Sequence, residues 1–168
     1  MEKKNIILVG FMATGKTTIG KLLAKQTGMR FVDMDAIIEE REGRTINDIF
    51  ATDGEPHFRK LEGALAKELA QTSGLIISTG GGIVLNPDNI AALDTTGLVA
   101  CLMGKPEEII RRVASCTARP LLAGNKEKQV RALFEQRRPL YESIPFQVMT
   151  DGLKPTEIAE KILQEFQS

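Results

Sequence analysis

Short apolar runs alternate with amphipathic segments along the whole of this chain. Apolar runs that are bounded by polar or turn-forming residues are typical of β-strands buried on both faces. We therefore expect five strands, which are Asn5–Val9, Arg30–Met34, Leu75–Thr79, Gly97–Met103 and Phe146–Thr150.

Between these runs, apolar residues recur every three or four positions, which is the spacing of one helix face. Ile19 and Leu23 mark such a face after the first strand, and Pro106 and Pro155 each begin a later helix. A continuous alternation of strands and helices predicts the α/β class, with a parallel sheet between two layers of helices.

Two segments are longer than a simple alternation of strands and helices requires. Residues 35–70 are interpreted as two or three short helices, with Thr45 at a helix start. Residues 115–126 are polar and contain Arg119. Compact domains keep such stretches mainly where they bind or cover a ligand. We expect one domain over residues 1–168, in which the first segment binds an acceptor substrate and the second forms a lid.

Charge and composition exclude several classes of function. Lys plus Arg and Asp plus Glu balance at 22 each, so no basic field is available to bind nucleic acid. No apolar stretch approaches the roughly 20 residues that a membrane span needs. The two cysteines form neither a disulfide framework nor a metal-ligand set. We expect a cytoplasmic protein with neither nucleic-acid nor membrane partners.

The first strand leads into Gly10-Phe11-Met12-Ala13-Thr14-Gly15-Lys16-Thr17, which has the spacing G-x-x-x-x-G-K-[ST]. Glycines let the backbone curl so that successive N–H groups point at phosphate oxygens, and the helix that follows adds its positive end. Lys16 is placed to reach the β- and γ-phosphates, and the hydroxyl of Thr17 to bind Mg²⁺. The pattern predicts a phosphate-binding loop.

The acids narrow the choice among proteins with such a loop. Most place an acid at the end of a later strand to hold Mg²⁺, but here the strand at 75–79 ends in three glycines. Asp33 and Asp35 end the second strand instead, and their two-residue spacing allows both to face the carboxyl edge of the sheet. Asp33 suits the Mg²⁺ shell and Asp35 an acceptor hydroxyl. The alternative is that Asp35 caps a helix and Asp33 is a solvated loop acid.

Gly80-Gly81-Gly82 offers either its backbone N–H groups to a ligand or simply a permissive turn. Arg59, Arg119 and the pair Arg137-Arg138 are candidate anion clamps, because guanidinium groups bind carboxylate and phosphate in bidentate fashion. Taken singly, each arginine is more typical of a solvated surface residue. Taken together around one phosphate loop, they favour the clamps.

In their order along the chain, these motifs resemble the shikimate kinase family, a group of small P-loop kinases similar to nucleoside-monophosphate kinases. The matches are the phosphate loop, Asp33-Met34-Asp35 with D-x-D, Gly54 to Glu62 with G-E-x-x-F-R-x-x-E, Gly80-Gly81-Gly82, Arg119-Pro120-Leu121-Leu122 with R-P-L-L, and Arg137 to Tyr141 with R-x-P-L-Y. The resemblance covers essentially the whole chain. It implies a P-loop kinase fold and ATP-dependent phosphorylation of the shikimate 3-hydroxyl, in the pathway to aromatic amino acids.

The resemblance also implies how the acceptor is bound. Asp35 would bind the hydroxyls next to the reacting centre. Orientation of the acceptor is its first expected role, and removal of the hydroxyl proton by its carboxylate is a hypothesis. Arg59, Arg137 and the backbone of Gly81 would hold the shikimate carboxylate.

On the nucleotide side, Lys16 and Arg119 would stabilise charge on the phosphoryl group, and together with Asp35 they would be the catalytic residues. Thr17 and Asp33 would organise Mg²⁺, the implied cofactor. The implied ATP-binding residues are Ala13, Thr14, Gly15, Lys16, Thr17, Thr18, Arg112, Arg119 and Pro155. Arg112 and Pro155 match positions that flank adenine in the family.

The chain departs from the family pattern in its phosphate loop, and two other functions are alternatives to the one that the resemblance implies. The family often has Gly-Ala or Gly-Ser where this chain has Ala13-Thr14, but neither is a fixed glycine of the general pattern, so we expect nucleotide binding to survive. A kinase of the same fold that acts on gluconate or a nucleoside monophosphate is the nearest alternative. A non-catalytic nucleotide-binding module is another, although an intact set of Lys16, Thr17, Asp33 and Arg119 argues against it. We expect a monomer.

Overall fold

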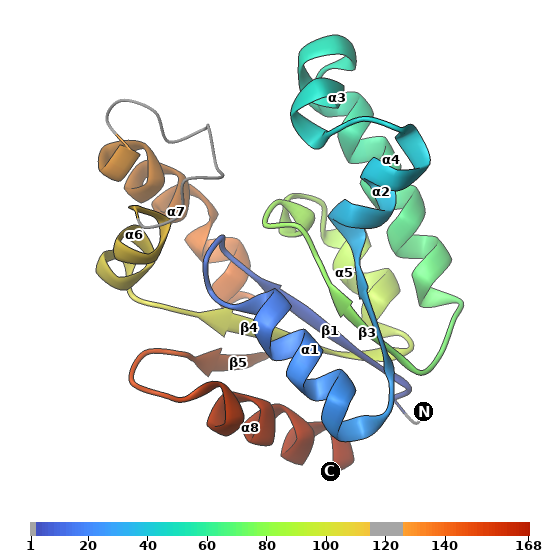
Figure 1. Cartoon of the computed structure of the whole chain (residues 1–168), viewed down its shortest axis with the longest axis vertical. Helices are drawn as coiled ribbons and strands as arrows, with labels where there is room; N and C mark the ends of the chain where they lie inside the picture. The colour runs from blue at the N-terminus through green and yellow to red at the C-terminus, as the bar shows by residue number, and fades with distance from the viewer. Residues whose placement is uncertain (1–2, 115–125) are drawn as a thin grey trace.

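The computed structural model describes residues 3–114 and 126–168 and contains a five-stranded parallel sheet with helices on both faces (Figure 1). The strands are β1 (Asn5–Gly10), β2 (Arg30–Asp33), β3 (Leu75–Ser78), β4 (Gly97–Met103) and β5 (Phe146–Met149). Their order in the sheet is β2-β3-β1-β4-β5. The predicted fold class and the five strands are confirmed, and each strand ends within one residue of its predicted end.

The helices are α1 (Lys16–Thr27), α2 (Met34–Glu42), α3 (Ile46–Asp53), α4 (Glu55–Ala70), the short 3₁₀ helix η1 (Ile83–Leu85), α5 (Pro87–Asp94), α6 (Pro106–Ala114), α7 (Lys126–Glu142) and α8 (Pro155–Gln167). Segment 35–70 therefore holds three helices as predicted, but α4 has 16 residues and is not short. Residues 115–125 of the predicted lid, Arg119 among them, lie outside the described residues.

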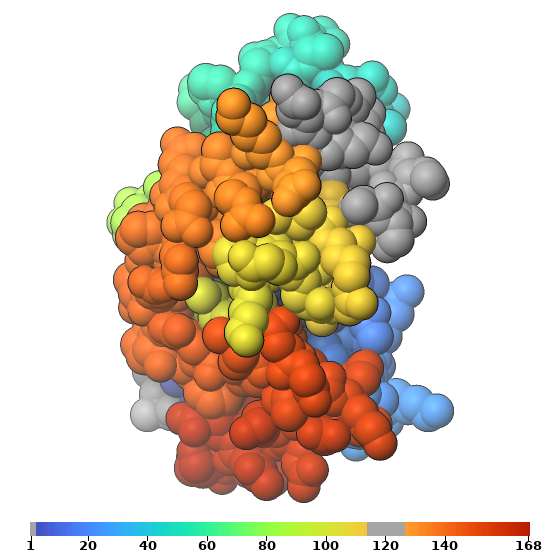
Figure 2. Space-filling view, turned by 90° about the vertical axis from the view of Figure 1, so that its left-hand side faces the viewer, coloured from blue at the N-terminus to red at the C-terminus, as the bar shows by residue number. Residues whose placement is uncertain are grey.

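Alternation along β1 divides the core into two layers. Ile6 and Leu8 pack with α1 and α8 on one face, whereas Ile7 and Val9 pack with the helices of the other face. Both pairs are fully buried because β1 is the central strand and is covered on both sides. Figure 1 shows α8 below β5, with α1 next to it, and Figure 2 shows the side of the molecule where α6 and α7 lie above α8.

The strand register brings the candidate chemistry to one edge of the sheet. Asp33 at the end of β2 pairs with Ser78 at the end of β3, and Ser78 pairs with Leu8 of β1. All strands are parallel, so the phosphate loop, the D-x-D motif and the triple-glycine turn leave the sheet at the same carboxyl edge.

Helix α2 begins directly at the end of β2, and this corrects one interpretation of the two aspartates. The buried side chain of Met34 starts the helix, and Asp33 is its N-cap, with Oδ1 accepting a hydrogen bond from Ala36 N at 3.2 Å. Asp35 lies in the first turn and is not the cap. Thr45 caps α3 as predicted, because its hydroxyl accepts from Asp48 N at 3.1 Å.

Asn5 ties together the starts of neighbouring strands. Its buried amide donates to Thr72 O at 2.8 Å and accepts from Leu75 N at 2.9 Å. We expect Asn5→Ala to lower the free energy of unfolding by about 2 kcal/mol, because buried backbone groups lose their partners. Thr95→Ala removes an exposed hydroxyl bonded within its own helix end and should cost under about 0.5 kcal/mol. Equal losses in urea denaturation would contradict this account.

Candidate active site

The phosphate loop is closed around the ammonium group of Lys16. The Lys16 Nζ atom donates to the carbonyl oxygens of Gly10 at 2.7 Å and Phe11 at 2.9 Å. Gly15 adopts the left-handed conformation with φ 94° and forms the N-cap of α1, whose first turn carries no acidic residue. The positive end of α1 and the Lys16 ammonium therefore lie together at the carboxyl edge of the sheet.

The departure at Ala13-Thr14 has a structural consequence. Ala13 has φ 60° and is the one residue other than glycine with positive φ in the part of the chain that the structure describes. A side chain in this region costs roughly 1–2 kcal/mol. The Thr14 hydroxyl is turned inward and donates to Phe11 O at 2.7 Å. Any contact of these two residues with a phosphate group therefore relies on their backbone N–H groups.

The triple-glycine turn lacks side chains because charged groups occupy the space around it. A β-carbon on Gly80 would lie 2.9 Å from Asp35 Oδ1 and 3.3 Å from Glu62 Oε2. A β-carbon on Gly82 would overlap the guanidinium group of Arg59. The structure thus brings Asp35 of α2 to Arg59 and Glu62 of α4 at this turn, and the packing of their side chains is a reason for glycine here that is separate from turn geometry and from ligand binding.

Gly81 joins the phosphate loop to the arginine of α7. A β-carbon on Gly81 would lie 3.4 Å from Arg137 Nη1 and 3.9 Å from the carbonyl oxygen of Gly10. No carboxylate in residues 3–114 and 126–168 forms an ion pair with Arg137. Its neighbour Arg138 is exposed and paired with Glu135 and Glu142. Of the two, Arg137 is therefore the one placed to bind an anion at this edge.

Arg59 is held by two acids of its own helix, α4. It contacts Glu55 at 3.0 Å and Glu62 at 2.9 Å, and its guanidinium lies 5.2 Å from the centre of the Phe58 ring. Glu62 is only 1% exposed, and its second oxygen, Oε2, has no hydrogen-bond partner among the described residues. Burial raises the pKa of the Glu62 carboxyl, and the charge of Asp35 adds to this, although Arg59 opposes the shift.

The other predicted nucleotide residues lie around the loop. Arg112 on α6 donates to Ala13 O at 3.1 Å. Thr17 and Thr18 are exposed in the first turn of α1. Pro155 begins α8, after the segment that follows β5. The structure therefore places Arg112 against the phosphate loop, and it gives no contact between that loop and Pro155.

A magnesium ion would find few protein ligands here. No group of three or more His, Cys, Asp or Glu residues suited to a metal occurs in the described ranges. The exposed Thr17 hydroxyl and the Asp33 carboxylate are oxygen donors of the kind that Mg²⁺ prefers, and Mg²⁺ usually takes its remaining ligands from water and substrate phosphates. One oxygen of Asp33 already caps α2, so its second oxygen is the one available.

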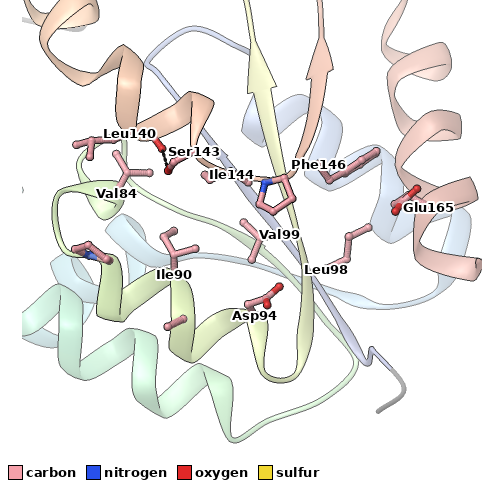
Figure 3. Close-up of a pocket in the computed structure, with 13 residues that line it drawn as sticks. Val84, Ile90, Asp94, Leu98, Val99, Leu140, Ser143, Ile144, Phe146 and Glu165 are labelled. Atoms are coloured by element: carbon pink, nitrogen blue, oxygen red, sulfur yellow. Dashed lines mark hydrogen bonds between the residues drawn. The ribbon is translucent and has the colours of Figure 1, made fainter.

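A pocket of about 410 Å³ lies elsewhere, beside the amino-terminal ends of β4 and β5 (Figure 3). It is lined mainly by apolar side chains, which include Val84, Ile90, Leu98 and Phe146. Among the described residues, its charged lining consists of the acids Asp94 and Glu165, with neither lysine nor arginine. It therefore suits neither phosphate nor carboxylate, and it contains none of the predicted site residues.

Two buried polar residues of the site belong to the motifs described above, but the sequence alone indicates no role for them. Glu62 lies one helical turn after Arg59, which is a spacing that signals an ion pair on a helix. Tyr141 is fully buried, and its hydroxyl donates to Gly81 O at 2.6 Å. Its bond spans 60 residues of sequence, so only the fold reveals it.

No helix in the described ranges is long and apolar enough to cross a membrane.

Comparisons with known proteins agree on one family. A model described as shikimate kinase matches residues 12–167. The chain is 43% identical to a shikimate kinase of Thermodesulfovibrio yellowstonii over 165 residues, which are 98% of this chain and 95% of that protein. It superposes on a shikimate kinase of Acinetobacter baumannii, solved in complex with shikimate, with a TM-score of 0.89 and 36% identity, covering 98% of this chain and 93% of that one.

The fold extends beyond this family. A gluconokinase of Sinorhizobium meliloti superposes with a TM-score of 0.62 at 17% identity, covering 99% of this chain and 94% of that one. At this identity the likeness shows a shared fold alone. The acceptor must therefore be argued from the site and from the higher-identity relatives.

The buried carboxyl of Glu62 predicts a pH dependence of stability. Its pKa in the folded state lies above the ordinary value of 4.5, so the wild type loses stability relative to Glu62→Gln as pH rises above 4.5 through the folded-state pKa. We expect the unfolding free energy of Glu62→Gln minus that of the wild type to increase between pH 4 and pH 7. Denaturant titrations at several pH values measure it, and a difference that shrinks with rising pH would be incompatible with the buried acid.

Proposed function

The chain belongs to the shikimate kinase family, and we propose that it transfers the γ-phosphoryl group of ATP to the 3-hydroxyl of shikimate, giving shikimate 3-phosphate and ADP. One observation supports the assignment of particular residues to this reaction. The triple-glycine turn has Asp35, Arg59 and Arg137 packed around it, and its middle glycine adjoins Gly10 of the phosphate loop. An acceptor bound at the turn would therefore lie next to the phosphates of a bound nucleotide.

On the acceptor side, Arg137 and the backbone of Gly81 would bind the shikimate carboxylate, and Arg59 would share its guanidinium between this carboxylate and its own acids. Guanidinium groups suit this task because two parallel N–H donors match the two carboxylate oxygens. Asp35, on the far side of the turn next to Gly80, would bind the hydroxyls. The two ends of the acceptor would thus be oriented by opposite charges.

On the nucleotide side, the backbone of residues 13–18 would cradle the phosphates, and Lys16 would exchange its loop carbonyls for phosphate oxygens. Thr17 and Asp33 would hold Mg²⁺, which supplies charge neutralisation to the phosphates when it is bound. Arg112 would contact the nucleotide from α6, and Pro155 remains a prediction for the adenine side. Arg119, which lies outside the described residues, remains a prediction as a second positive charge on the phosphoryl group.

Phosphoryl transfer needs mainly in-line positioning and charge stabilisation. Asp35 would first orient the attacking hydroxyl, and proton removal by its carboxylate is a further hypothesis. Arg59 and Arg137 alone do not exclude gluconate as the acceptor, because gluconate also carries a carboxylate. The D-x-D motif with Asp35 and the triple-glycine turn favour shikimate. A monomeric state and a cytoplasmic location stay predictions.

The acceptor assignment is tested by a matched pair of arginine variants. We expect ADP release from ATP and Mg²⁺ to depend on shikimate and not on gluconate or AMP. Arg137→Ala should raise the KM for shikimate by about 100-fold or more, since a charge-assisted bidentate contact is lost. Arg138→Ala removes the adjacent exposed arginine and should leave the KM within about twofold. Equal effects of the two variants, or turnover with gluconate, would refute the assignment.

The role of Asp35 is tested by Asp35→Asn, which keeps the shape and removes the charge. If orientation dominates, kcat at saturating shikimate should fall by less than about tenfold while the KM rises. Loss of a general base typically costs about 10²–10⁴ in rate, and a kcat loss of that size would show that proton removal is the main role. Asp48→Asn, in the first turn of α3, is the control and should change neither constant.

A further inference from the structure

The single tyrosine of the chain is placed between the two groups that would bind the acceptor carboxylate. The Tyr141 hydroxyl donates to the carbonyl oxygen of Gly81 at 2.6 Å. Arg137 lies one helical turn earlier on α7. A β-carbon on Gly81 would lie 3.4 Å from Arg137 Nη1 and 3.9 Å from the Tyr141 hydroxyl oxygen, so both side chains approach the middle residue of the triple-glycine turn.

The surroundings hold this hydroxyl in one place. Tyr141 is fully buried, and its ring packs edge-on against Phe11 of the phosphate loop, with centroids 6.3 Å apart. Phe11 in turn packs edge-on against Phe134 at 5.4 Å. Burial raises the pKa of Tyr141 to about 12, so the hydroxyl keeps its proton at neutral pH and acts as a fixed donor to Gly81.

We propose that Tyr141 is a positioning residue, which sets the direction of the Arg137 guanidinium and of the Gly81 peptide toward the carboxylate of the acceptor. The inference rests on the proposed function, because it concerns how that site binds its acceptor. The hydroxyl holds the Gly81 carbonyl by its hydrogen bond and lies on the same side of this peptide as the Arg137 guanidinium. Phenylalanine in its place would keep the ring contact with Phe11, remove the hydrogen bond to Gly81 and leave a gap beside Arg137.

A merely structural role makes a different prediction. If the hydroxyl served only to satisfy the buried carbonyl of Gly81, its removal would lower stability and affect all ligands of the site alike. If it positions the Arg137 guanidinium and the Gly81 peptide, its removal would weaken the binding only of ligands that carry the carboxylate. The methyl ester of shikimate has the same ring and hydroxyls without that charge, so it distinguishes the two roles.

The test compares Tyr141→Phe with the wild type. We expect the KM and dissociation constant for shikimate to rise about tenfold, the size of effect that one lost hydrogen bond gives. The kcat, the KM for ATP and the dissociation constant of the methyl ester should stay within about twofold. Ser143→Ala, which removes an exposed hydroxyl at the end of the same helix, is the matched control and should resemble the wild type.

A second measurement leaves the hydroxyl group at position 141 in place. Because the chain has one tyrosine, growth with 3-fluorotyrosine labels position 141 alone. We expect its ¹⁹F resonance to shift on addition of shikimate and to shift far less with the methyl ester. Equal losses for acid and ester, an unchanged KM, or equal ¹⁹F shifts would each overturn the inference. A wild type that neither binds nor phosphorylates shikimate would overturn the proposed function, and the inference with it.

Discussion

The turn after β3 carries no side chains, and the charged groups of the site occupy the space that this leaves. Gly80 leaves room for the carboxylates of Asp35 and Glu62, and Gly82 leaves room for the guanidinium of Arg59. These groups come from α2 and α4, which reach the turn only because the sheet places β3 between β2 and β1. A methyl group at Gly80 would require the Asp35 carboxylate to move, and one at Gly82 would require the Arg59 guanidinium to move.

The same packing explains why so much charge is tolerated in a buried site. Glu62 is almost completely buried, which is costly for a carboxylate unless a cation accompanies it. Arg59 supplies that cation, and its second acid, Glu55, is exposed at the rim. Arg137 is different, because no ion pair within the described residues engages it. Arg59 is therefore already partnered by two acids of its own helix, whereas Arg137 has no ion pair among the described residues.

Much of this fold can be predicted from the sequence, because buried parallel strands are apolar runs and the phosphate loop has fixed spacing. It was not predictable that Asp33, and not Asp35, caps α2, since the start of α2 depends on the burial of Met34 against tertiary neighbours. The length of α4 and the buried contacts of Glu62 and Tyr141 were also missed. These features arise from residues that meet only after the chain folds.

A crystal structure of the chain with ADP and shikimate tests the central claim most directly, namely that the triple-glycine turn holds the acceptor beside the phosphate loop. The account predicts the shikimate carboxylate within hydrogen-bonding distance of the Arg137 guanidinium and the Gly81 backbone, with a hydroxyl at Asp35. Shikimate bound in the pocket beside Pro87 and Phe146, or with its carboxylate turned away from Arg137, would contradict it.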